Sequence, residues 1–297
     1  MNNAHAENVK LGVLLALSAS FCNTVMSVFA KLLGDGQSTT AIVFARFAVG
    51  LLVLLPWFCT DKNLLKVKSP MGVLMRCVTS IMAMVCVFYS LNYMPVANVL
   101  LLNNTFPLFL PLLSLIMLGI KTPPRMLIGI IIGFLGVALA LNPSANAFNW
   151  HALIALLSGL LAALAMLQIR LLVQGSSSKQ ILFYLFAFGT IASGIFLPFS
   201  FVMPTSHQFL LLFFVGLFGA GYQLFLTLAL NYAKARVVSP IYFSSILFAA
   251  VFDWVLWSIK LSTLEVIGLG LIIAGGILTI LLAESSAAPG PDQAKPA

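Results

Sequence analysis

The sequence predicts an all-α polytopic membrane protein with ten transmembrane helices, arranged as two five-helix repeats inserted in opposite orientations. Three observations support this prediction. Of the 297 residues, 61% are hydrophobic and only 7% are charged, whereas about a quarter are charged in an ordinary soluble domain. The apolar residues form long continuous runs, as membrane helices require and alternating strands do not. The second half of the chain also aligns with the first.

Ten apolar runs are close to the roughly 20 residues that a helix needs to cross a bilayer. Short segments rich in Gly, Pro, Ser and Asn separate them, as is typical of turns. None of these segments could hold a soluble domain, so any chemistry takes place within the membrane or at its faces. The first run is longer than the apolar core of a signal peptide and has a counterpart later in the chain, so we expect it to be retained. The runs cover residues 11–33, 38–58, 70–91, 96–119, 125–142, 150–173, 180–203, 207–231, 237–259 and 264–283.

An offset of 139 residues aligns the two halves with almost no gaps. Because five helices is an odd number, the second copy must enter the membrane upside down. Inverted repeats place a substrate site near the midplane, between halves that give alternating access. The pairs that carry the alignment are Lys31 with Arg170, Phe47 with Phe186, Gly50 with Gly189, Asn92-Tyr93 with Asn231-Tyr232, Lys121 with Lys260, Gly129 with Gly268 and Gly136 with Gly275.

The domain organisation and topology follow from the runs and from the basic residues. We expect a first repeat over 11–142, a second, inverted repeat over 150–283, and a disordered tail over 284–297. With the N-terminus in the cytoplasm, eleven Lys and Arg residues fall in inside segments, and only Lys31 and Lys260 fall outside. This bias fits the positive-inside rule, so we expect a multi-pass protein of the bacterial inner membrane with both termini cytoplasmic. The net charge of +8 is scattered and forms no basic stripe for nucleic acid.

Motifs for cofactors, metals and catalysis are not found in the sequence. Cys22, Cys59, Cys77 and Cys86 show neither CxxC spacing nor a nearby His cluster, so we expect no disulfide framework and no metal site. No P-loop occurs, so ATP is not the direct energy source, and we expect no cofactor. The seven acidic residues are nearly all isolated, which disfavours a membrane-embedded enzyme and predicts no catalytic residues.

Polar residues inside the apolar runs are costly in lipid, so we expect them to face protein or a water-filled cavity. In the first run they share one helical face from Ser20 to Lys31, which can line a cavity or form interhelical hydrogen bonds; both interpretations stay open. In the fourth run, Pro107 and Pro111 follow two amides and predict a kink. The residues that we expect to bind substrate are Asn23, Ser27, Arg76, Asn103, Asn104, Gln168, Tyr222, Gln223, Tyr242 and Ser245.

Three charged residues lie well inside the runs. Asp253 is the only acidic residue well inside a run, and it shares a helical face with Tyr242 and Ser245. We expect it to form an ion pair with Arg46, or to carry a coupling proton or bind a cationic substrate group. Arg46 and Arg76 stay protonated and would attract a carboxylate or phosphate. Arg76 is also close enough to the cytoplasmic face to reach the interface instead.

Several ordered motifs resemble the drug/metabolite transporter superfamily, of the EamA-like ten-helix type. They include Phe44-Ala45-Arg46-Phe47 in the second run, Met75-Arg76-Cys77 in the third, the segment from Phe88 to Ala97, Pro107 in the fourth and the Gly-rich stretch from Gly129 to Gly136 in the fifth. The arrangement is similar to bacterial S-adenosylmethionine uptake carriers, including Ser239-Pro240-Ile241-Tyr242. The resemblance implies a ten-helix carrier.

Together these features predict a secondary transporter that moves a small organic metabolite by alternating access. An amino acid, a nucleoside or a solute like S-adenosylmethionine would fit. A lipid-head-group translocase is the alternative, which Arg76 and the basic loops could serve, and a membrane-embedded transferase is less favoured. The expected partners are a small-molecule substrate and membrane lipid, with no nucleic acid, and a homodimer stays open. The sequence specifies neither the direction of transport nor the coupling ion.

Overall fold

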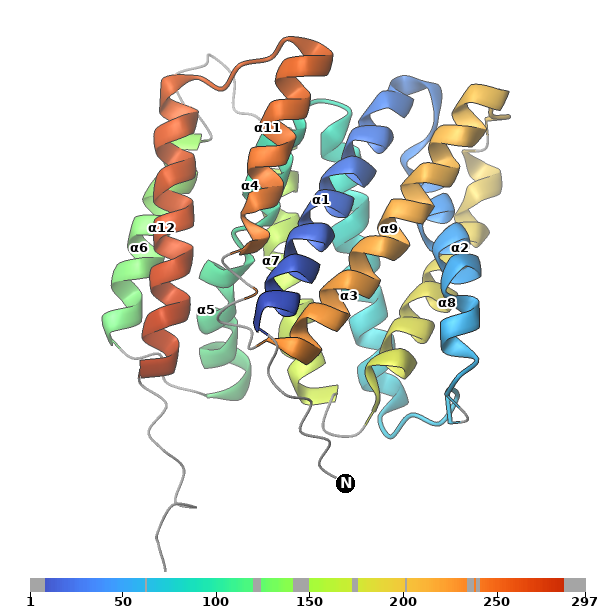
Figure 1. Ribbon diagram of the computed structural model, residues 1–297, viewed down its shortest axis with the longest axis horizontal. Coiled ribbons are helices and arrows are strands. Elements are labelled where there is room, and N and C mark those ends of the chain that lie inside the picture. Colours follow the sequence, from blue (N-terminus) through green and yellow to red (C-terminus); the bar gives the residue numbers. More distant parts are fainter. Residues whose placement is uncertain are drawn as a thin grey trace, which may run out of the picture.

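The computed structural model is a bundle of helices that run roughly side by side (Figure 1). It describes residues 9–61, 63–119, 124–140, 150–172, 176–200, 202–233, 238 and 241–285. Within these ranges every regular element is helical. Seven helical stretches are long and apolar enough to cross a membrane, and three shorter apolar helices complete the ten spans. The chain is therefore a multi-pass membrane protein.

The helix bounds follow the predicted runs closely, except in the fourth and ninth spans. The fourth span is two helices, and the ninth is described only at Val238 and from Ile241 onwards. The last helix ends at Ser285, two residues into the predicted tail, whose remainder lies outside the described residues. The first half holds α1 (Val9–Leu33), α2 (Thr39–Phe58), α3 (Pro70–Leu91), α4 (Val96–Asn103), α5 (Phe106–Leu118) and α6 (Pro124–Ala140). The second half holds α7 (Trp150–Leu172), α8 (Ser178–Phe196), α9 (Ser206–Tyr232), α11 (Ser244–Trp257) and α12 (Thr263–Ser285).

Capping residues define where two helices of the second half begin. Ser177 and Gln180 form a reciprocal capping box at the start of α8, and Thr205 and Gln208 form another at the start of α9. Each box satisfies two backbone N–H groups that have no partner within the helix. The Gln208 side chain also accepts a hydrogen bond from Gln37, which ties this cap to the start of α2.

The contact between α6 and α12 is reciprocal under the 139-residue offset. A Cβ atom added to Gly136 would lie 2.7 Å from the carbonyl oxygen of Gly268, and one added to Gly275 would lie 2.6 Å from the carbonyl oxygen of Gly129. Each contact is therefore the copy of the other, as a two-fold axis requires. The end of one helix meets the start of the other, so the two helices are antiparallel. An axis that relates antiparallel helices lies across them, in the plane of the membrane, which is the geometry of an inverted repeat.

The same reciprocity occurs where α2 meets α8. The ring of Phe186 packs on Gly50, and the ring of Phe47 packs on Gly189. The two rings themselves lie edge to face, 6.0 Å apart. These residues are aligned pairs in the sequence repeat. Each glycine therefore leaves room for a phenylalanine ring from the other half. The structure thus confirms two inverted five-helix repeats.

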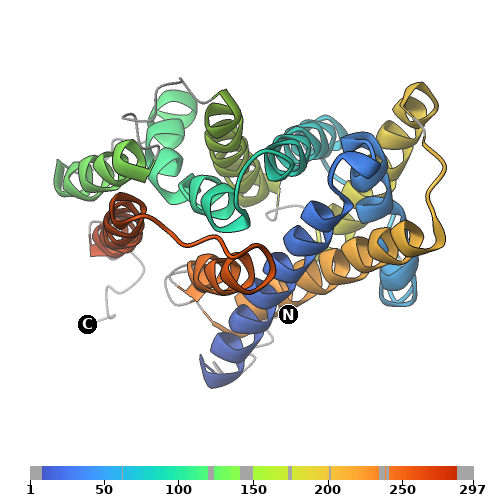
Figure 2. The same cartoon turned by 90° about the horizontal axis from the view of Figure 1, so that it is seen from above.

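Three spans of the first half each contact the equivalent span of the second half, and these three pairs follow one another along the long axis of the molecule (Figure 1). The α6–α12 pair lies at one edge, the α2–α8 pair lies towards the other, and α4 and α11 lie between them (Figure 2). α1 packs on both α9 and α11, so the first helix is embedded in the second half. This interlocking puts residues from both halves side by side in the centre.

Candidate functional site

The fourth span breaks in the middle, at Asn104 and Thr105. α4 ends at Asn103, and α5 begins at Phe106 with Pro107 in its first turn, where the missing N–H group costs little. Gly159 of α7 packs against the break, because a Cβ atom there would lie 2.6 Å from both the Leu102 carbonyl oxygen and the Thr105 hydroxyl. The expected kink is therefore a two-residue turn that divides the span into two helices.

The ninth span breaks at the equivalent position. α11 begins at Ser244 after a turn at Phe243, which is 139 residues beyond Asn104. The two breaks touch each other, since the Asn104 amide donates a hydrogen bond to the Ser245 hydroxyl across 2.9 Å. Discontinuous helices at corresponding positions of two inverted halves are typical of transporter substrate sites, because they expose backbone and side-chain polar groups near the midplane.

The polar face of α1 packs against this junction. The Thr24 hydroxyl donates to the Ser245 carbonyl oxygen at 2.9 Å, and the Ser20 hydroxyl donates to the Ile241 carbonyl oxygen at 3.4 Å. The Ser27 hydroxyl donates to the Asn23 carbonyl oxygen on its own helix. Ser20 and Thr24 therefore join helices, which is one of the two roles open for this face. Asn23 and Ser27 are buried beside them.

Arg46 of α2 is buried among aromatic rings. Its side chain is 1% exposed, and the guanidinium lies 5.7 Å from the Phe47 ring centre and 5.5 Å from that of Phe186. Gly219 of α9 makes room for it, because a Cβ atom there would lie 2.5 Å from Nη1. The Nε and Nη1 atoms are buried and have no hydrogen-bond partner.

Arg76 of α3 has the same character. It is 6% exposed, and its Nε and Nη1 atoms are also buried without a partner. The expectation that Arg76 reaches the membrane interface is therefore wrong, because the protein encloses the guanidinium. Tyr222 lies one turn beyond Gly219 on α9, the residue that packs on the Arg46 guanidinium. The Tyr222 ring lies 5.8 Å from the ring of Tyr242, whose buried hydroxyl likewise has no partner.

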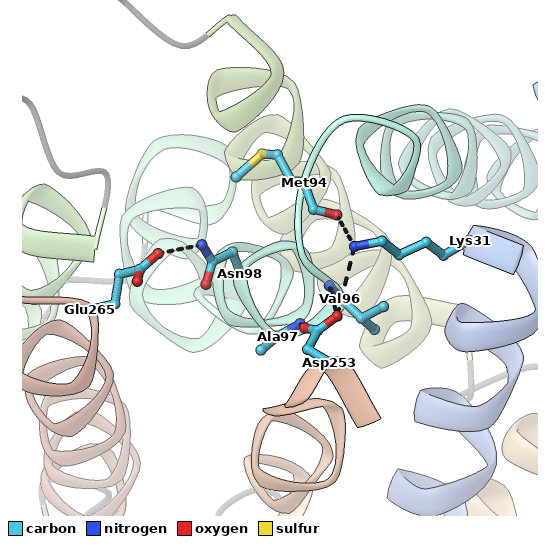
Figure 3. A network of polar contacts seen from close by, with 7 residues as sticks. All are labelled: Lys31, Met94, Val96, Ala97, Asn98, Asp253 and Glu265. Atoms are coloured by element: carbon cyan, nitrogen blue, oxygen red, sulfur yellow. Dashed lines mark hydrogen bonds and ion pairs between the residues drawn. The ribbon is translucent and has the colours of Figure 1, made fainter. Parts of the chain in front are cut away.

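Asp253 pairs with Lys31 and not with Arg46, which corrects the expected ion pair. Its Oδ1 atom lies 3.7 Å from the Lys31 ammonium (Figure 3). The same carboxylate accepts the N–H groups of Val96 at 3.1 Å and Ala97 at 2.7 Å, so it caps the start of α4. A carboxylate suits a helix N-terminus, where backbone N–H groups and the helix dipole favour negative charge. The pairing with Arg46 rested on depth alone, and depth cannot tell which helices are neighbours.

The polar network beside Asp253 includes Lys31 of the predicted polar face and three residues that the sequence analysis did not single out: Asn98, Ser262 and Glu265. Lys31 also donates to the Met94 carbonyl oxygen at 2.9 Å and lies 4.7 Å from the Trp257 ring centre. Glu265 accepts a hydrogen bond from the Asn98 amide and caps α12 together with Ser262. The spacing of Ser262 and Glu265 is a capping-box signature, which could have marked this helix start in advance.

The remaining predicted residues lie around this centre rather than in it. The Asn103 amide donates to the Ser158 hydroxyl of α7 at 3.0 Å. Gln168, also on α7, accepts a hydrogen bond from Thr79 of α3 at 2.8 Å. Gln223 is half-buried on α9 next to Tyr222. The structure therefore brings Asn104 to Ser245 and Tyr222 to Tyr242, with Arg46 packed on Gly219 one turn from Tyr222. Asn23 and Ser27 are buried on α1, Arg76 is buried on α3, and Asp253 lies two turns beyond Ser245 on α11.

Metal and redox chemistry gain no support in the described part of the chain. No group of three or more His, Cys, Asp or Glu side chains is placed to hold a metal ion there. All four cysteines are free thiols, and Cys59 is the exposed one.

The sequence profile of the EamA-like transporter family matches residues 10–142 and 149–281, which is nearly the whole described bundle. The chain belongs to the EamA-like transporter family. The profile matches twice, once in each half, in agreement with the reciprocal helix contacts. EamA-like relatives are named as transporters, and this chain is accordingly a small-molecule transporter and not an enzyme.

Individual relatives extend over almost the full chain. The chain is 31% identical over 276 residues to the pseudopaline exporter CntI of Pseudomonas aeruginosa, which covers 92% of this chain and 94% of that protein. It is 26% identical over 249 residues to the S-adenosylmethionine uptake transporter of Rickettsia felis, which covers 82% and 83%. A crystal structure with 18% identity superposes with a TM-score of 0.64 over 94% of this chain and 99% of that one, which shows the fold. One relative exports and another imports, so the EamA-like fold fixes neither direction nor substrate.

Proposed function

We propose that this protein is a secondary carrier that moves a small organic metabolite across the bacterial inner membrane by alternating access, with both termini in the cytoplasm. The observation that carries the proposal is the junction of Asn104 with Ser245. There two broken helices, one from each inverted half, meet beside buried polar groups that lack partners. A binding site on the axis between two halves is reachable from either face when the halves rock against each other.

The Asp253 network forms a gate in this proposal. It joins α1 and α4 of the first half to α11 of the second at the end of the bundle where α1 ends. In the proposed orientation this end faces the outside. The carboxylate is not repeated in the first half, because Ser114 stands at the position equivalent to Asp253 and donates to the Leu110 carbonyl oxygen of its own helix. Opening towards the outside would have to separate Lys31 from Asp253.

A binding screen followed by counterflow tests the proposal. Purified protein is first screened by thermal shift against amino acids, nucleosides and S-adenosylmethionine, because a bound solute stabilises the native state by mass action. Proteoliposomes are then preloaded with an unlabelled hit, and uptake of the labelled hit is measured. A carrier shows saturable uptake that preloading accelerates. Linear, non-saturable flux would indicate a channel and would overturn the proposal.

Two variants make the counterflow test specific. Asn104→Leu removes the amide at the junction, and we expect it to lose counterflow. Gly270→Ala serves as the matched control, because nothing lies within 4 Å of a Cβ atom at that position. If both variants transport equally well, the junction is not part of the pathway.

A further inference from the structure

The two buried arginines carry an inference about the chemistry of the solute, which rests on the proposed function. We propose that the transported solute is an organic anion whose negative charge is held between the guanidinium groups of Arg46 and Arg76, beside the Tyr222 hydroxyl. A guanidinium stays protonated in proteins and presents several donors in a planar fork that matches carboxylate and phosphate oxygens.

The first argument is that both guanidinium groups are buried without compensation. Each has two nitrogen atoms that are buried and unpartnered. A buried charge is strongly unfavourable unless it is paired and hydrogen-bonded. The carboxylates described in the bundle are engaged elsewhere, since Asp61 binds Ser177 in a loop contact, Asp253 binds Lys31, and Glu265 binds Asn98. Two positive charges thus lie in the protein interior with no negative partner in the described part of the chain.

The second argument comes from the repeat, which shows that packing does not require these arginines. The residues equivalent to Arg46 and Arg76 in the second half are Leu185 and Val215. Both are fully enclosed, at 1% and 0% exposed. The same helix environments are therefore built once with aliphatic side chains and once with guanidinium groups. The difference between the halves identifies the two charges as a functional addition to a fold that packs without them.

The third argument is position. Arg46 lies about 10 Å along α2 from one end of the bundle, and Arg76 lies about 9 Å along α3 from the other, at 1.5 Å per residue. The two residues therefore flank the midplane, and their long side chains can reach towards a common point. Tyr222 lies one helical turn from Gly219, the residue that packs on Arg46, and Tyr242 beside it adds a buried hydroxyl without a partner. Cationic forks with nearby aromatic rings suit an anion on an organic body.

Binding to purified protein tests this inference without requiring transport. Three four-carbon probes differ mainly in charge: succinate, succinamide and 1,4-diaminobutane. Glycerol 1-phosphate, compared with glycerol, distinguishes phosphate from carboxylate as the anionic group. We expect an anion to raise the melting temperature while its neutral and cationic counterparts do not. Stabilisation by succinamide or diaminobutane equal to that by succinate would overturn the inference.

The repeat itself supplies the variants. Arg46→Leu and Arg76→Val introduce the residues that the second half carries, and we expect each to weaken anion binding about ten- to a hundredfold. Arg46→Lys and Arg76→Lys keep the charge and should retain part of the binding. Lys68→Met, in an exposed loop, removes one positive charge elsewhere and should leave binding unchanged. Equal binding by wild type, Arg46→Leu and Arg76→Val would overturn the inference.

The stability of the ligand-free variants decides the matter even if no probe binds. Removing an uncompensated buried charge should leave the melting temperature of Arg46→Leu and Arg76→Val equal to or above that of wild type. A lower melting temperature, or failure to fold, would show that the guanidinium groups are part of the packing and would contradict the inference. Anion binding without counterflow would refute the carrier while sparing the anion site. Counterflow of a neutral or cationic solute in both aliphatic variants would support the carrier and refute the anion site.

Discussion

The Asp253 carboxylate lies 3.7 Å from the Lys31 ammonium and also accepts the first two N–H groups of α4. One side chain therefore joins three helices from both halves at one end of the bundle (Figure 3). A residue that holds two halves together at one end is suited to control access from that end.

We predict that Asp253→Asn lowers the free energy of unfolding by about 2–5 kcal/mol, because it leaves the Lys31 ammonium without its buried partner. Lys31→Met/Asp253→Asn should recover part of that loss, since no unpaired charge remains. Thermal or denaturant unfolding in detergent is measured for wild type, Asp253→Asn, Lys31→Met and the double variant. Additive losses in the double variant would show that the two charges do not interact.

Transport by Asp253→Asn addresses coupling. If Asp253 carries a coupling proton, gradient-driven accumulation should vanish while solute exchange persists, because an amide cannot take up and release the proton. Accumulation and exchange are measured in the same vesicles, with and without a proton gradient. Accumulation at the wild-type level would leave Asp253 with the role of a gate alone.

The hydrogen bond between Asn104 and Ser245 should show as a coupling energy. We expect the cycle of Asn104→Ala and Ser245→Ala to give about 1 kcal/mol, the net value of one buried hydrogen bond. The control pair is Asn104→Ala with Ser114→Ala, because the Ser114 hydroxyl binds its own helix. A coupling of zero for Asn104 with Ser245 would mean that the two breaks do not hold each other.

The two-fold contact of α6 with α12 predicts matched costs for equivalent substitutions. Gly136→Ala and Gly275→Ala should each destabilise the protein by about 1–3 kcal/mol, because the added methyl group meets backbone atoms that cannot move aside. Gly270→Ala, on the same helix as Gly275, has open space and should be neutral or slightly stabilising through helix propensity. Unequal effects at the two aligned glycines would argue against a symmetric contact.

The proposed orientation predicts the labelling of Cys59, the exposed cysteine at the end of α2. A membrane-impermeant maleimide should label it in inside-out vesicles and not in intact cells. Val202→Cys in a Cys59→Ser background, at the opposite end of the bundle, should show the reverse pattern, since Val202 is 52% exposed. Labelling of Cys59 in intact cells would place the termini outside.

Much of the architecture followed from the sequence, because lipid leaves few choices. Each span must satisfy its backbone hydrogen bonds internally, so length and hydropathy locate the helices within a few residues. The 139-residue repeat and the odd number of helices per copy then require inversion. The polar face of α1 and the shared face of Tyr242, Ser245 and Asp253 were likewise readable from helical spacing, and these residues are buried as expected, apart from the tip of Lys31.

Partner choice was decided only by the tertiary structure. Depth in the membrane made Arg46 a reasonable match for Asp253, but the packing of α1 against α11 puts Lys31 there instead. The interruption at Asn104 and its copy at Phe243 also needed coordinates, because proline marks a weak point without saying whether neighbouring helices will bend or break it. Helical periodicity fixes which residues share a face. Which face meets which depends on how ten helices cross, and the two contacts that define the site, Lys31 with Asp253 and Asn104 with Ser245, join residues more than a hundred positions apart.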